Sequence, residues 1–309
     1  MKPIAVVIPT RNRGLQAVEA ARAVLRDGTD FDFVVVDQSK NDVTAAAFRA
    51  MAPDPRLRVI RSRLCGISNA RNTGVAATSA PIIAFTDDDC RPPADWVSAM
   101  LRVFEEDPEA AMVFGRVHLP ESALPHDYAA SFEPRRRILE GKIPTPKGGF
   151  GIGANFAIRR CVLERLGGFD PLLGIGAPFF RAGEEVDLMI RALHAGYRVV
   201  NASECDVLHL GLRKGREIRR LVVHYQIATG AALAKHARLA GLSGLLDLLR
   251  WVRFYTREAI TNTIRLRRSK LGAPCYFVVG ALLTLRYRMD REHDVFRARG
   301  RRGRRPLPA

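Results

Sequence analysis

Short apolar runs alternate with segments of helical spacing over residues 1–90. The runs have the length of β-strands, and the first intervening segment places Ala and Leu at helical intervals. This alternation predicts βαβ units with right-handed crossovers. The sequence therefore predicts an α/β fold with a Rossmann-like, mainly parallel central sheet flanked by helices. The expected strands are 4–8, 33–36, 57–61 and 82–85, and the expected helices are 14–26, 42–51 and 68–77.

The pattern becomes less regular beyond residue 90. Residues 119–150 contain five prolines and the pair Gly148-Gly149, so we expect a long mobile loop there. After His209 the chain becomes helical in pattern, which predicts a C-terminal helical extension. Further strands are expected at 112–117, 153–158 and 199–200, and further helices at 96–104, 160–166, 184–195, 215–239, 243–268 and 275–290.

Three consecutive aspartates, Asp87-Asp88-Asp89, directly follow the apolar run that ends at Thr86. Carboxylates this close raise one another's pKa unless a positive charge neutralises them. Oxygen ligands of this kind suit Mg²⁺ or Mn²⁺, and open α/β sheets place their ligands at the carboxyl ends of strands. The triplet thus predicts a divalent-cation site, with a solvated acidic turn as the alternative.

Positive charge is concentrated in the last third of the chain. Residues 210–309 hold 23 of the 49 basic residues and 6 of the 32 acidic ones, whereas residues 1–209 hold 26 of each. This asymmetry predicts a domain boundary near residue 210 and an anionic partner for the basic part. The expected parts are a catalytic domain at 1–210, a basic helical extension at 211–298 and a disordered basic tail at 299–309.

Cysteine spacing and hydropathy indicate a cytosolic protein. The five cysteines are odd in number and lack metal-ligand spacing, which is typical of reduced thiols. The amino terminus has the pattern of a strand rather than of a signal peptide. The charge-free run between Lys270 and Arg286 has fifteen residues, fewer than the roughly 18–20 that span a bilayer, so we expect no transmembrane helix.

Two further segments before the triplet could bind a nucleotide. Asp37 ends the run Val34–Val36, where a carboxylate can accept hydrogen bonds from ribose hydroxyls or base N–H groups; a helix cap or turn residue is the alternative. Ser68 and Arg71 open a helix, and a helix N-terminus with a nearby Arg can bind phosphate. The alternative there is a simple Ser68 cap with Arg71 as a surface charge.

Acidic residues and a histidine follow in the second half of the domain. Glu184, Glu185 and Asp187 lie in the first turn of an expected helix, where the helix dipole favours acids for structural reasons alone. They could also supply a general base beside a cation. His209 ends an apolar run and is either a structural residue or a third cation ligand beside two aspartates.

Together these segments resemble family 2 glycosyltransferases, which have the GT-A fold, over residues 3–210. The resemblance implies an inverting, metal-dependent transfer from a nucleotide-diphosphate sugar. The matching segments, in the family's order, are Pro9–Arg13, Asp37, Asn69–Asn72, Asp87–Asp89, Gly153–Asn155, Glu184-Glu185 and His209.

The resemblance also implies a role for each matching residue. Thr10, Arg11 and Asp37 would contact the base and ribose, and Arg71 the nucleotide side. Asp87 and Asp89 would form the family's aspartate pair around Asp88. The implied nucleotide-sugar ligands are thus Thr10, Arg11, Asp37, Arg71, Asp87 and Asp88, the ligands of Mn²⁺ or Mg²⁺ are Asp89, His209 and Asp87, and Asn155 and Glu184 face the acceptor.

The catalytic base departs from the family's pattern. Family members usually carry an Asp after a Glu at this point, whereas this chain carries Glu185. A Glu keeps the carboxylate but extends it by one methylene group. Glu185 is therefore the expected base, and Asp187 is the second candidate.

The basic extension lies outside the resemblance, so its physical pattern alone indicates a role. Trp251, Phe254 and Tyr255 among arginines suit an interfacial helix on anionic lipid. The alternatives are a helical packing layer with a solvated basic face, and a nucleic-acid-binding surface, for which no known module is present. We expect peripheral attachment to the cytoplasmic, inner face of the plasma membrane.

The expected activity is transfer of a hexose or deoxyhexose from a UDP, GDP or dTDP donor. The acceptor would be a hydroxyl of a lipid-linked or polysaccharide molecule in cell-envelope or exopolysaccharide synthesis. One alternative is a GT-A-like sugar nucleotidyltransferase, but that class opens with a glycine-rich loop where this chain has Pro9–Arg13. The other is a non-enzymatic basic protein that binds membranes or nucleic acid.

Overall fold

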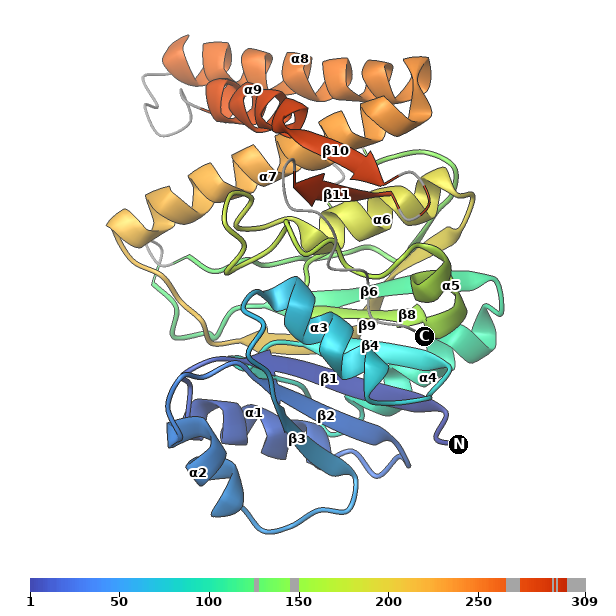
Figure 1. Cartoon of the computed structure of the whole chain (residues 1–309), viewed down its shortest axis with the longest axis vertical. Coiled ribbons are helices and arrows are strands. Elements are labelled where there is room, and N and C mark those ends of the chain that lie inside the picture. The colour runs from blue at the N-terminus through green and yellow to red at the C-terminus, as the bar shows by residue number, and fades with distance from the viewer. Residues whose placement is uncertain (125–127, 145–149, 265–272, 291, 293, 299–309) are drawn as a thin grey trace.

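The computed structural model describes residues 1–124, 128–144, 150–264, 273–290, 292 and 294–298. A central nine-stranded sheet is flanked by helices, and a further helical layer lies at one end (Figure 1). The strands of the sheet are β1 (Ile4–Thr10), β2 (Asp32–Asp37), β3 (Leu57–Arg61), β4 (Ile82–Thr86), β5 (Cys90–Arg91), β6 (Ala110–His118), β7 (Arg137–Leu139), β8 (Asn155–Arg159) and β9 (Arg198–His209).

The sheet is mostly parallel, as the sequence predicted. Its order is β3-β2-β1-β4-β8-β6-β9-β5, and β7 pairs with β9. The first four strands pair in parallel, as do β6 and β9. The strand β8 lies antiparallel between β4 and β6, and the short strands β5 and β7 lie antiparallel to β9. The alternation of strands and helices thus predicted the first half of the sheet, but the insertion of β8 depends on long-range pairing.

Helices cover both faces of the sheet because the buried strands are apolar on both sides. In β1, Ile4, Val6 and Ile8 pack with α1, α2 and α4, whereas Ala5 and Val7 pack with α3, α5 and α6 on the other face. The flanking helices are α1 (Leu15–Leu25), α2 (Val43–Arg49), α3 (Ile67–Ala76), α4 (Trp96–Glu106), α5 (Arg160–Arg165) and α6 (Glu184–His194).

The C-terminal layer contains three helices and a β-hairpin. Its helices α7 and α9 pack with their backbones in contact. A Cβ at Gly230 would collide with the carbonyl oxygen of Phe277, and one at Gly280 with that of Ile227, so only glycine at these two positions allows so close an approach. None of the helices in the described ranges has the length and apolar character needed to cross a bilayer. The elements of this layer are α7 (Arg216–Ala240), α8 (Leu242–Ile264), α9 (Ala273–Leu283), the 3₁₀ turn Thr284–Arg286, β10 (Tyr287–Asp290) and β11 (Val295–Ala298).

The structure corrects two expectations for this layer. The helix predicted over 275–290 ends at Leu283, because the residues that follow form the antiparallel hairpin of β10 and β11. Trp251, expected at a lipid interface, is buried and stacks on Phe150 with ring centroids 4.9 Å apart, while the ring of Tyr255 lies 5.2 Å from that of Phe277. The predicted disordered tail, 299–309, lies outside the described residues.

The predicted loop at 119–150 is more ordered than its composition indicates. Within its described part, β7 adds a strand to the sheet, and Phe132 and Tyr128 make isolated β-bridges to Val117 and Arg213. Prolines and glycines signal turns, but they do not show whether the residues between them pair with a distant strand. Residues 125–127 and 145–149 of this segment lie outside the described ranges.

A buried ion-pair network joins the C-terminal layer to the rest of the molecule. The ammonium group of Lys235 on α7 lies 2.8 Å from Asp170 Oδ2 and 2.8 Å from Asp187 Oδ1. Arg191 donates to Asp187 Oδ2 over 2.9 Å, and the backbone N–H of Phe296 in β11 donates to Asp170 over 2.7 Å. Elements on both sides of residue 210 therefore share one interior.

We predict that Lys235→Met destabilises the whole fold, because it leaves Asp170 short of its cation and Asp187 with Arg191 alone. Breaking a buried ion pair by removing one partner costs on the order of 3–5 kcal/mol. Denaturant unfolding should show a clearly lower midpoint for this variant. The matched control is Lys40→Met at an exposed position, which should leave the midpoint almost unchanged. Equal midpoints for the two variants would contradict a stabilising role for the network.

Candidate active site

The three aspartates lie at the carboxyl edge of the sheet, in the link between β4 and β5. Asp88 accepts a 2.7 Å hydrogen bond from the hydroxyl of Thr10 at the end of β1, and its other oxygen lies 3.5 Å from Arg13. Arg13 also lies 3.7 Å from Asp89. The end of β1 and the segment after it therefore hold the triplet in place. Thr10 uses its buried hydroxyl for this purpose.

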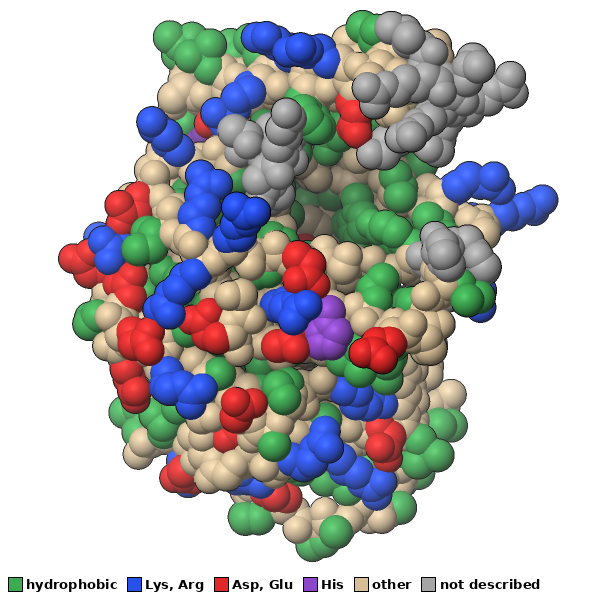
Figure 2. Space-filling view, turned by 180° about the vertical axis from the view of Figure 1, so that it is seen from behind, with side chains coloured by type: hydrophobic (Ala, Val, Ile, Leu, Met, Phe, Trp, Pro, Cys, Tyr) green, Lys and Arg blue, Asp and Glu red, His purple; other side chains and the backbone are tan. Residues whose placement is uncertain are grey.

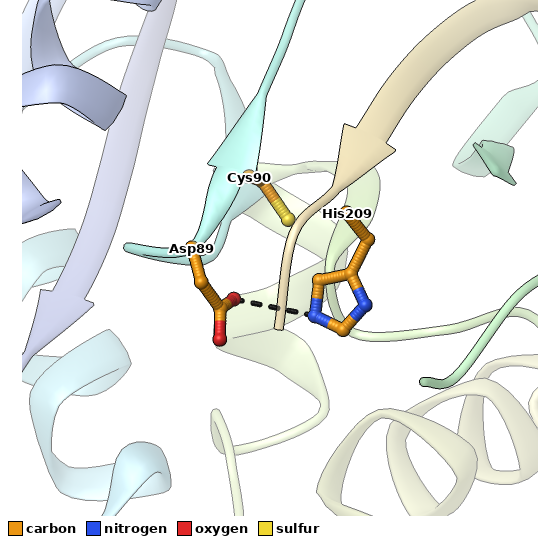
Figure 3. Close-up of side chains that lie close together, drawn as sticks. All are labelled: Asp89, Cys90 and His209. Carbon is orange, nitrogen blue, oxygen red and sulfur yellow. Dashed lines mark ion pairs between the residues drawn. The ribbon is translucent and has the colours of Figure 1, made fainter. Parts of the chain in front are cut away.

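Asp89 and His209 face one another across neighbouring strand ends (Figure 3). The Nε2 atom of His209 lies 3.2 Å from Asp89 Oδ1, and the thiol of Cys90 completes a group of donor atoms within 4.8 Å of one another. The ring nitrogen Nδ1 of His209 is buried and has no hydrogen-bond partner among the described residues. The predicted pair of cation ligands is thus together in space.

Charge favours the ionised forms of this pair. Burial alone would lower the pKa of His209 and raise that of Asp89. Burial is the largest single cause, but the hydrogen bond between the two groups and the charges around them together outweigh it, so the pKa of His209 is raised and that of Asp89 is lowered. Burial and the charges of Asp87 and Asp89 raise the pKa of Cys90 well above its usual value, which keeps its sulfur a thiol. Cys90 is therefore a poor cation ligand beside a carboxylate and an imidazole.

Gly211 lies directly against this pair. A Cβ there would lie 3.1 Å from His209 Nε2 and closer still to Asp89 Oδ2, so any larger residue would push the carboxylate out of place. With glycine at this position the oxygen and nitrogen donors of Asp89 and His209 stay side by side, which fits a divalent cation. Carboxylate and imidazole together suit Mn²⁺, and Mg²⁺ would bind chiefly through carboxylate and water.

The guanidinium of Arg71 is wholly buried behind the triplet. It lies 3.3 Å from Asp87 Oδ1 and 2.8 Å from Glu184 Oε1, and it donates to the carbonyl of Gly153 over 2.8 Å. Three aromatic rings surround it, with centroids 5.4–5.8 Å from its carbon: those of Phe85, Phe156 and Phe169.

The burial of Arg71 and Ser68 corrects the predicted phosphate site at the start of α3. Ser68 forms no helix cap, because its hydroxyl donates to the carbonyl of Leu173 over 2.7 Å. The first helical N–H, from Ile67, donates to the carbonyl of Ile175. Arg71 is neither a surface charge nor exposed to a ligand. Its position instead orients Asp87 and Glu184.

Two carboxyl groups of the triplet are easily protonated in the absence of a cation. Burial is the main cause that raises the pKa of Asp87 to about 7, with Arg71 opposing it and Asp89 adding to it. Burial also raises the pKa of Asp88 to about 6, against the hydrogen bond from Thr10. A cation beside Asp89 would favour the charged forms of both groups.

Glu185 lies in the first turn of α6, directly after the buried Glu184. It keeps part of its surface accessible, whereas Glu184 is held by Arg71. Burial and the charges of Glu184 and Asp87 raise the pKa of Glu185 to about 8, although Arg71 opposes the shift. The charges of Glu185 and Asp87 also act on Tyr225 of α7, so these groups are neighbours. Glu185 is therefore a partly exposed carboxyl beside the triplet.

Asp187, the second candidate base, lies in a different environment. It is buried and shared between Lys235 and Arg191, which form the ion pairs described above. These two basic side chains hold its carboxylate in the interior between α6 and α7. Its charge accordingly belongs to the network that joins the two parts of the fold.

Asn155 does not reach an accessible surface, which corrects its predicted place on the acceptor side. Its side chain is fully buried. Its amide nitrogen donates to the carbonyls of Arg116 and Cys205, and its amide oxygen accepts a 2.9 Å hydrogen bond from Trp96 Nε1. These bonds connect β8 with β6, β9 and α4. Glu184 is likewise enclosed, with Arg71 as its partner.

The two remaining predicted ligands lie beyond the triplet, at the ends of β1 and β2. Asp37 Oδ1 accepts from the N–H of Ser39 over 2.8 Å, while its buried Oδ2 has no partner among the described residues. The side chain of Arg11 is exposed, and its backbone N–H donates to Asp88. The unpaired oxygen of Asp37 offers an acceptor, and the exposed Arg11 offers a cation, to a polar ligand at this edge.

Residues that the sequence analysis did not assign complete this edge. Arg13 had been noted only as part of a motif, although its position two residues after Arg11 could have suggested a second cation. Gly211 and Tyr225 follow the predicted boundary at residue 210, outside the segment that resembles the family, so no motif indicated them. Figure 2 shows acidic, basic and histidine side chains beside a hollow whose wall is hydrophobic.

Curated relatives share part of this chain. The pre-mycofactocin glycosyltransferase of Mycobacterium tuberculosis is 30% identical over 207 residues, which cover 64% of this chain and 40% of that protein. The validoxylamine A glucosyltransferase of Streptomyces hygroscopicus is 28% identical over 40% of this chain and 30% of its own length. The glucosyl-dolichyl phosphate glucuronosyltransferase of Haloferax volcanii is 25% identical over 47% of each protein. The chain thus spans less than half the length of these relatives.

Solved structures share the fold. The mannosyltransferase PcManGT from Pyrobaculum calidifontis, in complex with GDP-Man and Mn²⁺, superposes with a TM-score of 0.61 at 17% identity, over 92% of this chain and 87% of that one. This likeness confirms the predicted GT-A fold. The model of the glycosyl transferase family 2 matches residues 5–167, more than half of the chain. The chain therefore belongs to glycosyl transferase family 2.

Proposed function

We propose that this chain is an inverting, metal-dependent glycosyltransferase, and that its donor is a hexose or deoxyhexose carried by UDP, GDP or dTDP. The observation that carries the proposal is the facing pair of Asp89 and His209, which lie directly against Gly211. The partly accessible Glu185 lies beside the same triplet. A cation site and a carboxyl group of raised pKa at one sheet edge suit transfer to a hydroxyl group.

The nucleotide binds, in this proposal, at the ends of β1 and β2. The unpaired Oδ2 atom of Asp37 would accept from the base or ribose, and the exposed Arg11 would neutralise phosphate. Thr10 and Asp88 support that surface through their mutual hydrogen bond, and Arg71 acts from behind it. The solved complex of PcManGT with GDP-Man supports a nucleotide-sugar donor.

Asp89 and His209 would hold Mn²⁺ or Mg²⁺, with Asp87 as a further oxygen ligand. The bound cation would neutralise the negative charge that develops on the leaving nucleotide diphosphate. Arg13 lies 3.7 Å from Asp89 and Arg71 lies 3.3 Å from Asp87. Each arginine thus helps to hold one of these carboxylates, while His209 would bind the cation as a neutral imidazole. Mn²⁺ in the complex of PcManGT supports a divalent cation here.

Glu185 is the proposed general base. It would accept the proton of the acceptor hydroxyl while that oxygen attacks the anomeric carbon from the side opposite the leaving group, so that the configuration inverts. Glu184 positions this turn of α6 through its ion pair with Arg71. Asp187 is a poor candidate because Lys235 and Arg191 neutralise it.

The acceptor we propose is a lipid-linked or polysaccharide hydroxyl in cell-envelope or exopolysaccharide synthesis, reached at the inner face of the plasma membrane. The name of the Haloferax volcanii relative, which includes dolichyl phosphate, supports a lipid-linked molecule. The basic C-terminal third supports a location beside anionic lipid. No specific nucleic acid is expected.

The first prediction concerns donor turnover. With Mn²⁺, the full chain should release nucleoside diphosphate from at least one member of a panel of UDP-, GDP- and dTDP-sugars, and EDTA should abolish release. The nucleotide should also raise the melting temperature only when the cation is present. The proposal would be overturned if no donor released a nucleoside diphosphate and no nucleotide bound in a cation-dependent way. Pyrophosphate formation from a sugar phosphate and a nucleoside triphosphate would instead identify a nucleotidyltransferase.

A second prediction concerns Gly211→Ala. The added Cβ would push the carboxylate of Asp89 out of place beside His209, so the apparent affinity for Mn²⁺ should fall by roughly 10–100-fold. A Mn²⁺ titration of nucleotide-dependent thermal stabilisation measures this affinity. Gly215→Ala is the control, because its Cβ meets open space. Its positive φ should cost some stability, but equally with and without Mn²⁺, so the apparent Mn²⁺ affinity should not change. Unchanged Mn²⁺ affinity in Gly211→Ala would contradict a cation at this position.

A third prediction concerns the pH dependence of turnover. A base must be deprotonated to act, so kcat/KM should rise with pH toward the pKa of Glu185, about 8, and a bound cation should move the midpoint lower. Glu185→Gln should lose roughly 10²–10⁴-fold activity together with that rise. Glu185→Asp should retain the rise, because the carboxylate remains. If Asp187→Asn loses the rise instead, the base is Asp187.

A further inference from the structure

The outer faces of α8 and α9 expose many large apolar side chains. On α8 they follow one stripe of the helix, at i, i+3, i+4 and i+7, and α9 is apolar around its whole circumference. Leu246, Leu249 and Leu282 are 58%, 53% and 59% exposed. Single exposed apolar residues are ordinary, but such a group on two neighbouring helices marks an interaction surface. Its members are Leu242, Leu245, Leu246, Leu249, Ile260, Tyr276, Val278, Val279, Leu282 and Leu285.

Basic residues border this surface. Arg253 and Arg257 continue the outer stripe of α8, and Arg286 and Arg288 are exposed directly after α9. Figure 2 shows hydrophobic and basic side chains side by side along the upper end of the molecule, where α8 lies in Figure 1. We name the apolar residues above together with these four arginines the α8–α9 face.

Acidic groups are kept off the outer surface of α8. Its two acids, Asp247 and Glu258, are both half-buried, and Asp247 pairs with Arg250 and lies 3.6 Å from His236. The exposed charges of this helix are therefore positive. An apolar stripe flanked by cations complements the interface of an anionic bilayer, where leucines enter the acyl boundary and arginines meet phosphate headgroups.

The aromatic residues of α8 explain why the surface consists of leucines. Trp251 and Tyr255 face inward and pack against Phe150 and Phe277, so the inner stripe of α8 supports the C-terminal layer. The outer stripe contributes little to that core and remains free to contact a partner. Substituting it should therefore alter binding without unfolding the layer.

We propose that the α8–α9 face docks the protein on the surface of an anionic membrane, with its leucines inserted and none of its helices crossing. Membrane docking goes beyond the proposed transfer reaction. Only the connection between docking and a lipid-linked acceptor rests on the proposed function. The protein would lie with its C-terminal layer against the bilayer.

Co-sedimentation of the full chain with lipid vesicles tests this docking. Wild-type protein should bind vesicles containing phosphatidylglycerol and should bind pure phosphatidylcholine vesicles at least about tenfold more weakly, with binding reduced by salt. Leu246→Ser/Leu249→Ser and Val279→Ser/Leu282→Ser should each lower the partition coefficient at least about tenfold. Arg253→Gln/Arg257→Gln should lower it by about tenfold at low salt only.

Matched controls lie elsewhere on the surface. Leu15→Ser/Ile138→Ser removes two equally exposed apolar side chains, and Arg22→Gln/Arg49→Gln removes two exposed charges from α1 and α2. Both should bind vesicles as the wild type does. Thermal unfolding, and the Mn²⁺-dependent shift with nucleotide, should be unchanged in every variant. That readout separates the two proposals, since a chain that binds vesicles but no nucleotide fails only as a nucleotide-sugar transferase.

Three results would overturn the docking proposal. The first is equal binding to neutral and anionic vesicles, and the second is wild-type binding by both serine pairs. The third is a wild-type dimer in light scattering that the serine pairs convert to a monomer, without vesicle binding by either form. That outcome would make the α8–α9 face a contact between two copies of this chain.

Discussion

The buried guanidinium of Arg71 is the interaction on which the candidate active site depends. It connects Asp87 after β4, Glu184 at the start of α6 and the backbone of Gly153 before β8. These segments are far apart in the chain, and the guanidinium of Arg71 joins them in one hydrogen-bonded group. Because a buried carboxylate without a partner is costly, Glu184 could not keep its place without this cation. The triplet and the first turn of α6 thus share one electrostatic centre.

Much of the fold and several site residues could be predicted from the sequence. The alternation of strands and helices indicated the parallel half of the sheet, and the acidic triplet indicated its carboxyl edge. Asp89 and His209 were predicted as partners, and the structure places them 3.2 Å apart. Local pattern was sufficient here because each residue directly follows an apolar strand.

Predictions failed where burial rather than sequence position determines the role of a residue. Arg71 was expected to touch a nucleotide and Asn155 an acceptor, yet both side chains are enclosed by the fold. A motif names the residue that recurs, but it does not distinguish a group that binds a ligand from one that orients a neighbour. The sequence likewise did not show which residues of α8 face outward. Trp251 was expected at the lipid interface, but it faces inward and the leucines face outward.

The network around Lys235 also constrains how the chain can be synthesised. Asp170 and Asp187 belong to the glycosyltransferase part, but a cation that neutralises both arrives only with α7. As the chain leaves the ribosome, the first 210 residues therefore emerge with two interior carboxylates that still lack this partner. The sheet can form early, whereas the packing of α6 against its surroundings waits for residue 235. The first turn of α6 thus takes its final position only after α7 has been synthesised.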